Sequence, residues 1–163
     1  MNIVGNNLYL IWDYRKPTLA LLNYDTTSAR NACCGVVPVG PVVPCDTGTS
    51  YSGGSAFPDV QVIELGATTG VVTLTFNAIS VPDKFIIEFD GSEVINTGYR
   101  GSANKQGQLN TALADRGLPP ETIQGIGQGT ATFNKTTSTT TATLKVFAPL
   151  PGTSWSCTVS CPV

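Results

Sequence analysis

Residues 71–101 (VVTLTFNAISVPDKFIIEFDGSEVINTGYRG) constrain the fold more than any other stretch of the chain. Apolar and polar residues alternate over residues 72–77, which predicts a strand with one apolar face. Residues 84–89 are rich in β-branched and aromatic side chains, and the Asp-Gly pair that follows them is a strong turn signal. Residues 93–97 then return as a third strand. The stretch predicts a three-stranded meander whose apolar face needs a second layer.

Similar runs continue through residues 57–163. Alternation and β-propensity predict seven strands in this region, at residues 60–65, 71–79, 84–89, 93–97, 130–135, 140–147 and 154–160. Residues 108–117 predict one short helix, because Leu109 and Leu113 share a face and Gly117 suits its C-terminal end. Many short strands separated by turn signals indicate an all-β protein, an antiparallel β-sandwich resembling a jelly roll.

The first 56 residues have a different pattern. Residues 8–14 and 18–24 predict two short strands, which would form a small β-hairpin within an N-terminal anchor or docking segment at residues 1–34. The alternative is a small subdomain packed on the C-terminal domain. Residues 35–56 contain three prolines and then a Gly/Ser/Thr-rich run, which predicts an extended linker to a β-sandwich domain at residues 57–163.

Charge is scarce in this chain. Charged residues make up 12% of the sequence and the net charge is −2, against about 25% charged residues in an average soluble protein. This suits a particle-bound or extracellular protein whose surface is partly covered by neighbours. The scattered Lys and Arg residues argue against nucleic-acid binding, and no stretch approaches the ~20 apolar residues of a membrane span. The N-terminus lacks the charged region of a signal peptide, so we expect release by lysis.

The chain contains no histidine. Histidine is the commonest general base and metal ligand, and it activates most Ser and Cys nucleophiles. We therefore expect that the protein is not an enzyme and that it has no catalytic residue and no cofactor. Asp83, Glu88 and Asp90 are the carboxylates that the predicted strands bring nearest to one another. They would suit a Ca²⁺ ion or a glycosidase pair, but solvated charges at a strand end and a turn are the favoured interpretation.

The five cysteines are Cys33, Cys34, Cys45, Cys157 and Cys161, an odd number that excludes complete internal pairing. They lack the paired Cys-x-x-Cys spacing of zinc sites, so no metal site is expected. On one strand Cys157 and Cys161 would lie ~13 Å apart, which is too far for a disulfide unless the chain turns between them. Buried free thiols and one long-range disulfide, for instance Cys45 with a C-terminal cysteine, are the favoured alternatives.

Two other features suggest binding sites. Residues 125–129 (GIGQG) look like a phosphate-binding loop, but they precede a predicted strand rather than a helix, so we expect an ordinary loop. Among the aromatic residues, Tyr99 is a candidate for stacking on a sugar. Trp155 is expected in the core and Trp12 at an interface.

Two stretches of the sandwich region resemble a β-sandwich module of bacteriophage tail-fibre, head-fibre and related virion proteins, and of some bacterial surface proteins. They are VPDKFIIEFDGSEVINTGYRG at residues 81–101 and LKVFAPLPGTSWSCTVSCP at residues 144–162. The shared elements are a Pro-Asp-basic-Phe strand start, a Phe-Asp-Gly turn, a Thr-Gly-Tyr-Arg-Gly strand end and an Ala-Pro-Leu-x-Gly-Thr-x-Trp strand. Residues 8–35, with Ala-Cys-Cys after a Leu/Trp-rich run, resemble N-terminal segments of phage structural proteins.

The resemblance implies a structural virion component, such as a fibre, a tail or baseplate protein or a capsid decoration. Such a protein is assembled in the host cytoplasm and released by lysis. It would bind other virion proteins through residues 1–56, form a homo-oligomer and display its sandwich for attachment to host glycan. The alternative is a carbohydrate-binding module of a surface or secreted protein, which would use Tyr99.

Overall fold

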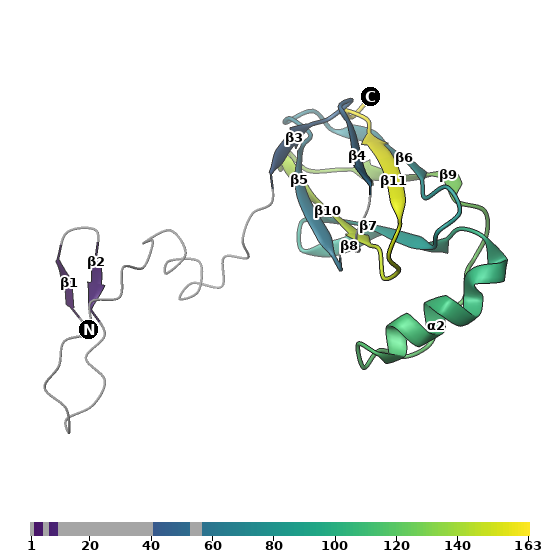
Figure 1. Ribbon diagram of the computed structural model, residues 1–163. Coiled ribbons are helices and arrows are strands. Elements are labelled where there is room, and N and C mark those ends of the chain that lie inside the picture. Colours follow the sequence, from purple (N-terminus) through teal and green to yellow (C-terminus); the bar gives the residue numbers. More distant parts are fainter. Residues whose placement is uncertain (1, 5–6, 10–40, 53–56) are drawn as a thin grey trace, which may run out of the picture. The chain divides into compact units, whose positions relative to one another are not determined.

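The computed structural model describes residues 2–4, 7–9, 41–52 and 57–163, and the chain divides into two units, residues 1–39 and 40–163 (Figure 1). In the first unit, β1 (Asn2–Val4) and β2 (Asn7–Tyr9) form an antiparallel hairpin. This hairpin lies ahead of the predicted one, because β2 overlaps only the start of residues 8–14. The other predicted strand, residues 18–24, lies outside the described residues.

The second unit is an all-β sandwich with one short helix, as the sequence predicts. One sheet has the order β3 (Val42–Pro44), β5 (Asp59–Glu64), β10 (Thr141–Phe147), β7 (Asp83–Phe89), β8 (Ser92–Arg100). The other has the order β4 (Gly48–Ser52), β11 (Ser154–Val159), β6 (Gly70–Asn77), β9 (Gln128–Lys135). A 3₁₀ turn, η1 (Ala103–Lys105), and α2 (Gln106–Ala114) lie between β8 and β9. All seven predicted strands are present, with small shifts at their ends.

The strand pairs of the sandwich are nested along the chain. The hairpin β7–β8 is innermost, and β6–β9, β5–β10 and β4–β11 follow outward, all antiparallel. Two further pairings, β10–β7 and β11–β6, roll this long ribbon into two sheets. That arrangement is a jelly roll, to which β3 adds an edge strand parallel to β5. The predicted fold class is confirmed.

The predicted meander over residues 71–101 is wrong in one respect. β6 belongs to the four-stranded sheet, whereas β7 and β8 pair in the five-stranded sheet. The chain crosses from one sheet to the other between β6 and β7, with Ile79 at φ 54°. The apolar faces therefore meet across the sandwich, where the rings of Phe76 and Phe85 stack with centroids 5.2 Å apart. Alternation identifies a buried face but not the sheet that carries it.

The inward faces of both sheets form the main hydrophobic core. Phe85 lies at its centre, with the ring of Trp155 edge-on at 6.1 Å. Trp155 is 2% exposed, so its predicted place in the core is confirmed. Other fully buried members are Leu65, Val72, Leu74, Ile87, Leu144 and Val146.

The predicted linker at residues 35–56, and with it a domain start at residue 57, is wrong for residues 41–52. This stretch supplies β3 and β4, which are edge strands of the two sheets. Proline lacks an N–H donor and is tolerated on sheet edges, so Pro41 and Pro44 do not exclude a strand here. Pro41 instead contributes its carbonyl to the N–H of Val62. Residues 35–40 and 53–56 lie outside the described residues.

The helix covers the outward face of the five-stranded sheet near β8. Leu109 and Leu113 pack against Tyr99 in a second, smaller core. The helix ends as predicted: Gly117 has φ 70°, its N–H donates to the Ala114 carbonyl, and the Leu118 N–H donates to the Leu113 carbonyl. This pair of bonds is a Schellman ending. Within the described residues, no helix has the length and apolar character needed to cross a bilayer.

Candidate functional site

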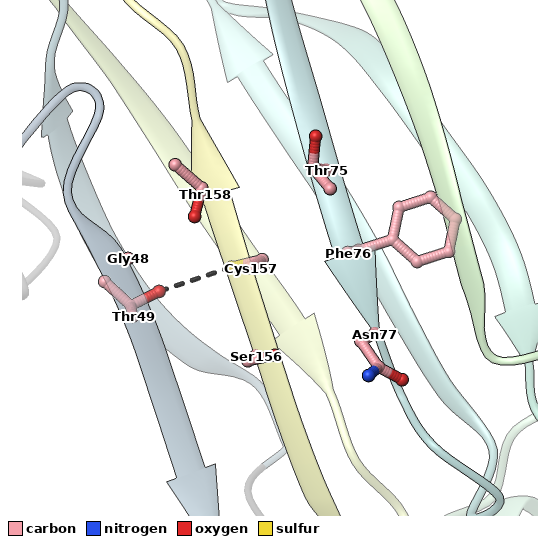
Figure 2. Close-up of a pocket in the computed structure, with 8 residues that line it drawn as sticks. All are labelled: Gly48, Thr49, Thr75, Phe76, Asn77, Ser156, Cys157 and Thr158. Atoms are coloured by element: carbon pink, nitrogen blue, oxygen red, sulfur yellow. Dashed lines mark hydrogen bonds between the residues drawn. The ribbon is translucent and has the colours of Figure 1, made fainter.

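A shallow hollow of about 350 Å³ lies on the four-stranded sheet, over strands β4, β11 and β6 (Figure 2). Gly48, Thr75, Asn77, Ser156 and Thr158 line it, and the buried Phe76 and Cys157 lie beneath. The lining follows from the period of two in a strand: the inward partners in β6 and β11 are apolar, and the outward ones carry hydroxyl or amide groups. Gly48 leaves the hollow open because it has no side chain.

The hollow is part of a wider polar face. The outward positions of β6, β9 and β11 carry ten Ser, Thr, Asn and Gln residues, namely Thr73, Thr75, Asn77, Gln128, Thr130, Thr132, Asn134, Ser154, Ser156 and Thr158. Val71 is the apolar exception, at one end of β6 and 45% exposed. We call these ten residues the hydroxyl–amide face. From the sequence, a polar side was recognised only for residues 72–77, although Thr at alternate positions in the other strands was the signal for such a face.

Cys157 cannot serve as a nucleophile in this hollow. Its side chain points inward and is 4% exposed, and its Sγ lies 3.3 Å from Thr49 Oγ1. Burial raises the pKa of this thiol to about 11, although the hydrogen bond with Thr49 acts in the opposite direction. Because the thiolate is the reactive form, this cysteine is inert at neutral pH. The buried free thiol that the sequence suggested is thus present.

The three candidate carboxylates have separate partners. Glu88 accepts a 2.6 Å salt bridge from Lys145 on the five-stranded sheet. Asp90 lies in the β7–β8 turn, where its Oδ2 accepts a 2.6 Å hydrogen bond from the hydroxyl of Thr137. Hydrogen bonds from Thr137 and Thr139 lower the pKa of Asp90, and the charge of Lys135 adds to this. Among the described residues these carboxylates do not gather as ligands of one ion.

Asp83 is the one candidate carboxylate that is fully buried. Both of its carboxyl oxygens lie within hydrogen-bond distance of the Thr153 hydroxyl, at 2.8 and 2.7 Å. Burial raises its pKa to about 7, an effect that the Thr153 hydrogen bond reduces. Asp83 therefore joins the start of β7 to the β10–β11 connection, and it is not a solvated charge at a strand end as the favoured interpretation had it.

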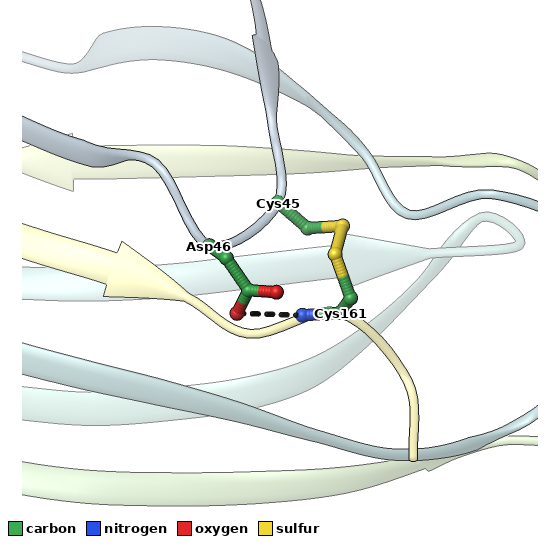
Figure 3. A group of neighbouring side chains, drawn as sticks. All are labelled: Cys45, Asp46 and Cys161. Carbon is green, nitrogen blue, oxygen red and sulfur yellow. Dashed lines mark hydrogen bonds between the residues drawn. A yellow bond between two sulfur atoms is a disulfide. The ribbon is translucent and has the colours of Figure 1, made fainter.

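The one group of potential metal ligands within the described residues consists of Cys45, Asp46 and Cys161 (Figure 3). The two cysteines form a disulfide with a Cα–Cα distance of 5.0 Å, so neither sulfur is available as a thiolate ligand. Asp46 Oδ1 accepts a 3.2 Å hydrogen bond from the Cys161 backbone N–H. The group is therefore a structural disulfide with a neighbouring carboxylate. Its long-range bond is the pairing of Cys45 with a C-terminal cysteine that the sequence suggested. Cys33 and Cys34 lie outside the described residues.

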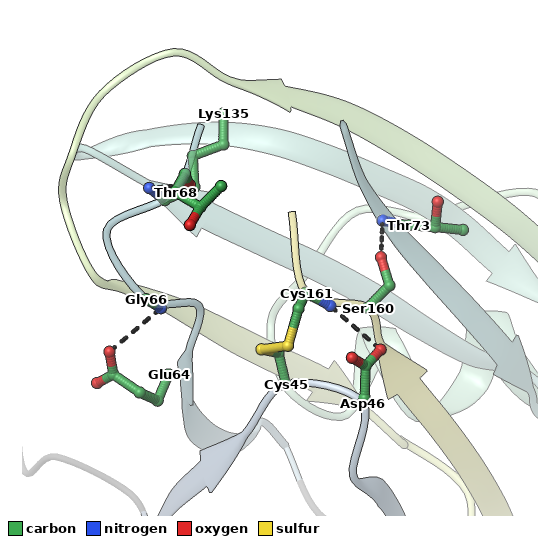
Figure 4. The surroundings of a disulfide bond; sticks show 9 residues. All are labelled: Cys45, Asp46, Glu64, Gly66, Thr68, Thr73, Lys135, Ser160 and Cys161. Atoms are coloured by element: carbon green, nitrogen blue, oxygen red, sulfur yellow. Dashed lines mark hydrogen bonds between the residues drawn. A yellow bond between two sulfur atoms is a disulfide. The ribbon is translucent and has the colours of Figure 1, made fainter. Parts of the chain in front are cut away.

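Lys135 lies fully buried at the same end of the sandwich as the disulfide (Figure 4). Its Nζ donates to the backbone carbonyls of Thr68 and Thr137, at 2.9 and 2.7 Å. The ammonium also lies 5.8 Å from the centroid of the Phe89 ring. Lys135 therefore ties the β5–β6 and β9–β10 loops together, and its donors are directed at the protein rather than at a ligand.

Tyr99 is not available to stack on a sugar, and this part of the carbohydrate-binding hypothesis is wrong. The ring is fully buried beneath α2, and the Lys84 ammonium lies 4.9 Å from its centroid. Lys84 also forms a 2.7 Å salt bridge with Glu121. Burial raises the pKa of Tyr99 above its ordinary value. Helix packing against an outward-facing strand position covers this tyrosine, and strand periodicity alone could not reveal it.

A second hollow, of about 750 Å³, lies between α2 and the β10–β11 connection. Its lining combines the charged Asp115 and Arg116 with Leu150 and two flanking prolines. The Arg116 guanidinium donates to the Ala112 carbonyl at 2.7 Å and stacks on the Phe57 ring at 4.9 Å. The arginine is therefore used in fastening α2 to the sandwich.

The glycines of residues 125–129 are required by close packing. A Cβ on Gly127 would lie 2.3 Å from the Ile79 carbonyl oxygen, and one on Gly129 would lie 2.7 Å from the Phe76 ring. The Gly127 carbonyl also accepts a hydrogen bond from the Ala78 N–H. These glycines let β9 approach the connection between β6 and β7. This packing role is consistent with the prediction of an ordinary loop.

Gly127→Ala is accordingly expected to destabilise the sandwich by about 1–3 kcal/mol, because the new methyl group overlaps backbone atoms. The matched control is Gly107→Ala in α2, where nothing lies within 4 Å of the added Cβ. That change should stabilise by about 0.5–1 kcal/mol through helix propensity. Urea unfolding of the two variants measures both effects, and equal effects would contradict the packing argument.

Comparisons with known proteins give only distant structural likenesses. No protein-family model matches the chain, and no curated protein matches it. The pre-peptidase C-terminal domain of a collagenase from Bacillus anthracis is similar over 76% of this chain and 98% of that domain, with 11% identity and a TM-score of 0.46. The class of protein is therefore defined by the chain's own architecture, which is a jelly-roll β-sandwich with a helical insertion.

Proposed function

We propose that this protein is a non-catalytic structural component of a bacteriophage particle, a fibre, tail, baseplate or capsid-decoration protein. Its N-terminal unit docks on the particle, and its jelly-roll unit is displayed, where it serves attachment to the host surface. The phage resemblance of residues 81–101 and 144–162 supports this assignment, as does the scarcity of charge.

The observation that carries the proposal is the position of the Cys45–Cys161 disulfide. Cys45 directly follows β3, and Cys161 lies just beyond the end of β11. The two ends of the nested ribbon are therefore joined covalently at one place (Figure 4). A mechanical force applied through the residues before Cys45 acts on this disulfide first. It acts on the nested strand pairs, from β4–β11 inward to β7–β8, only after that. That property suits a domain held from its N-terminal side and exposed to shear.

The proposed docking segment is shorter than the residues 1–56 expected from the sequence. Residues 41–52 belong to the sandwich, so partners in the particle would bind through the first unit, residues 1–39, rather than through residues 1–56. Most assemblies of repeated subunits have closed symmetry, so we expect a homo-oligomer. Its formation is expected to depend on the same unit.

Removing residues 1–39 is expected to abolish self-association. Full-length protein should form a defined oligomer, and residues 40–163, which contain both sheets and the disulfide, should be monomeric. Size-exclusion chromatography with light scattering compares the two forms, and mass spectrometry of purified particles from a lysate tests for the chain itself. A monomeric full-length chain, equal association of both forms, or absence from particles would each contradict the proposal.

A further inference from the structure

The hydroxyl–amide face differs in composition from the rest of the sandwich surface. Within the described residues, its ten outward side chains include no Asp, Glu, Lys or Arg. The opposite sheet carries the ion pairs Lys84–Glu121 and Lys145–Glu88, and α2 covers part of it. The uncharged face is thus the four-stranded sheet alone, and it lies open around the hollow (Figure 2).

The hydroxyl groups on this face form a regular array. Thr75 of β6 is paired with Thr130 of β9 on one side and with Thr158 of β11 on the other. Asn77 is likewise paired with Gln128 and Ser156. Neighbouring strands lie about 4.8 Å apart, and successive outward residues of one strand lie about 6.8 Å apart. The array therefore offers hydrogen-bonding groups in rows along and across the sheet.

The hydroxyls at the centre of the array are free to bind. In the part of the chain that the structure describes, the side-chain oxygens of Thr75, Thr130 and Ser156 have no hydrogen-bond partner in the protein. Each hydroxyl is both a donor and an acceptor. The hollow of about 350 Å³ lies at the lower end of the range of ligand-sized cavities, about 300–1,000 Å³. It is large enough to seat one ring of a longer molecule.

The chemistry of the hydroxyl–amide face favours one class of partner over nucleic acids, acidic glycans and proteins. A nucleic acid or an acidic glycan requires cations, which the face lacks. A protein interface of ordinary kind has an apolar centre rich in aromatic residues, Met and Arg, and is poor in Ser and Thr at its energetic centre. A neutral glycan presents many hydroxyls and no charge, and it matches an array of hydroxyl and amide groups.

We propose that the hydroxyl–amide face binds an extended neutral polysaccharide, with one sugar residue seated in the hollow beside Gly48. The polysaccharide lies on the face without aromatic stacking, and specificity comes from hydrogen bonds to the hydroxyls of Thr75, Ser156 and Thr158. Asn77 contributes its amide N–H groups, because its Oδ1 already accepts a 2.8 Å hydrogen bond from the Ile79 N–H. Each of these bonds replaces a bond to water, so a single site binds at about millimolar Kd. Display of many copies on a particle raises the overall avidity. This inference rests on the proposed function, because it names the class of host-surface ligand to which the displayed jelly-roll unit would attach.

Two kinds of variant of the full-length protein test the face. Thr75→Ala combined with Thr158→Ala removes hydroxyls, and Gly48→Val places a side chain over the hollow. A Cβ on Gly48 would meet Thr158 Oγ1 at 3.5 Å, an ordinary contact, so the backbone leaves room for the first carbon of a side chain there. The matched control is Thr141→Ala combined with Thr143→Ala, which removes hydroxyls from the outward side of β10 in the other sheet.

Affinity electrophoresis in gels containing dextran, galactomannan or a soluble β-glucan measures binding, with heparin and polygalacturonate as charged probes. At least one neutral polysaccharide should retard the wild-type protein, with little change between low and high salt. Retardation should weaken about tenfold in both face variants and remain in the β10 control. Thermal unfolding should show that all variants fold.

The proposal is overturned if none of the neutral polysaccharides retards the protein, if only the charged ones do, or if the control loses binding as much as the face variants. It is also overturned if light scattering shows that the face variants lose self-association, since the face then binds a second copy. These outcomes differ from a failure of the proposed docking function, which depends on residues 1–39 and is measured by their deletion.

Discussion

Reduction of the Cys45–Cys161 disulfide is expected to lower the free energy of unfolding of the sandwich by about 4 kcal/mol. The bond joins residues that are 116 positions apart, and closing a loop of ~100 residues removes about 4.7 kcal/mol of chain entropy from the unfolded state. Native disulfides in small domains commonly contribute about 2–5 kcal/mol. Guanidinium unfolding with and without reductant measures the difference.

Two variants separate this bond from the other thiols. Cys45→Ser combined with Cys161→Ser should have the stability of the reduced protein and should not respond to reductant. Cys157→Ala, which removes the buried free thiol, should keep the full response. A reductant effect of equal size in the double variant would show that the disulfide is not its source.

The second large effect is a loss of stability as pH rises, caused by Asp83. Its pKa is about 7 in the folded protein against an ordinary value of 3.8, so the folded state binds the proton more tightly than the unfolded state. The stabilisation is fully present below pH 3.8 and is lost as pH rises through 7. Roughly three pKa units correspond to about 4 kcal/mol. Asp83→Asn retains an oxygen acceptor for Thr153 and should remove this dependence.

The measurement is the difference in unfolding free energy between Asp83→Asn and wild type across pH 4–8. It should be small at pH 4 and should favour the variant by about 3–4 kcal/mol at pH 8. Thr153→Val, in the same contact, removes the donor that lowers this pKa and should shift the transition to higher pH. A difference that does not vary with pH would mean that Asp83 is not protonated in the folded state.

The strands of the sandwich were predictable from sequence because their inward faces are apolar at every second residue, as in Val72, Leu74 and Phe76. The edge strands β3 and β4 were not, because prolines, glycines and hydroxyl residues are typical of linkers as well as of sheet edges. The choice of sheet for β6 depends on the crossing at Ile79, where a positive φ redirects the chain. Local sequence does not specify that redirection.

The site was predicted less well than the fold. Asp83 is two residues from Phe85, and Lys135 is two from Phe133, so strand period alone places both charges on inward faces. For Asp83, residue type suggested exposure, and the strand period proved the better guide. Tyr99 is the opposite case, since its strand position faces outward and α2 covers it. The hydroxyl–amide face is visible only when strands from distant parts of the sequence are aligned.

The nested pairing has a consequence for how the protein is made. Each outward pair joins residues farther apart in sequence, from the β7–β8 hairpin to β4 and β11. Bringing distant segments together costs more chain entropy and slows folding. The pair β4–β11 is therefore expected to form last, and it places Cys45 beside Cys161. The disulfide then forms only in molecules whose strand pairing is already complete. A chain that has not finished folding lacks the disulfide and remains accessible to proteases.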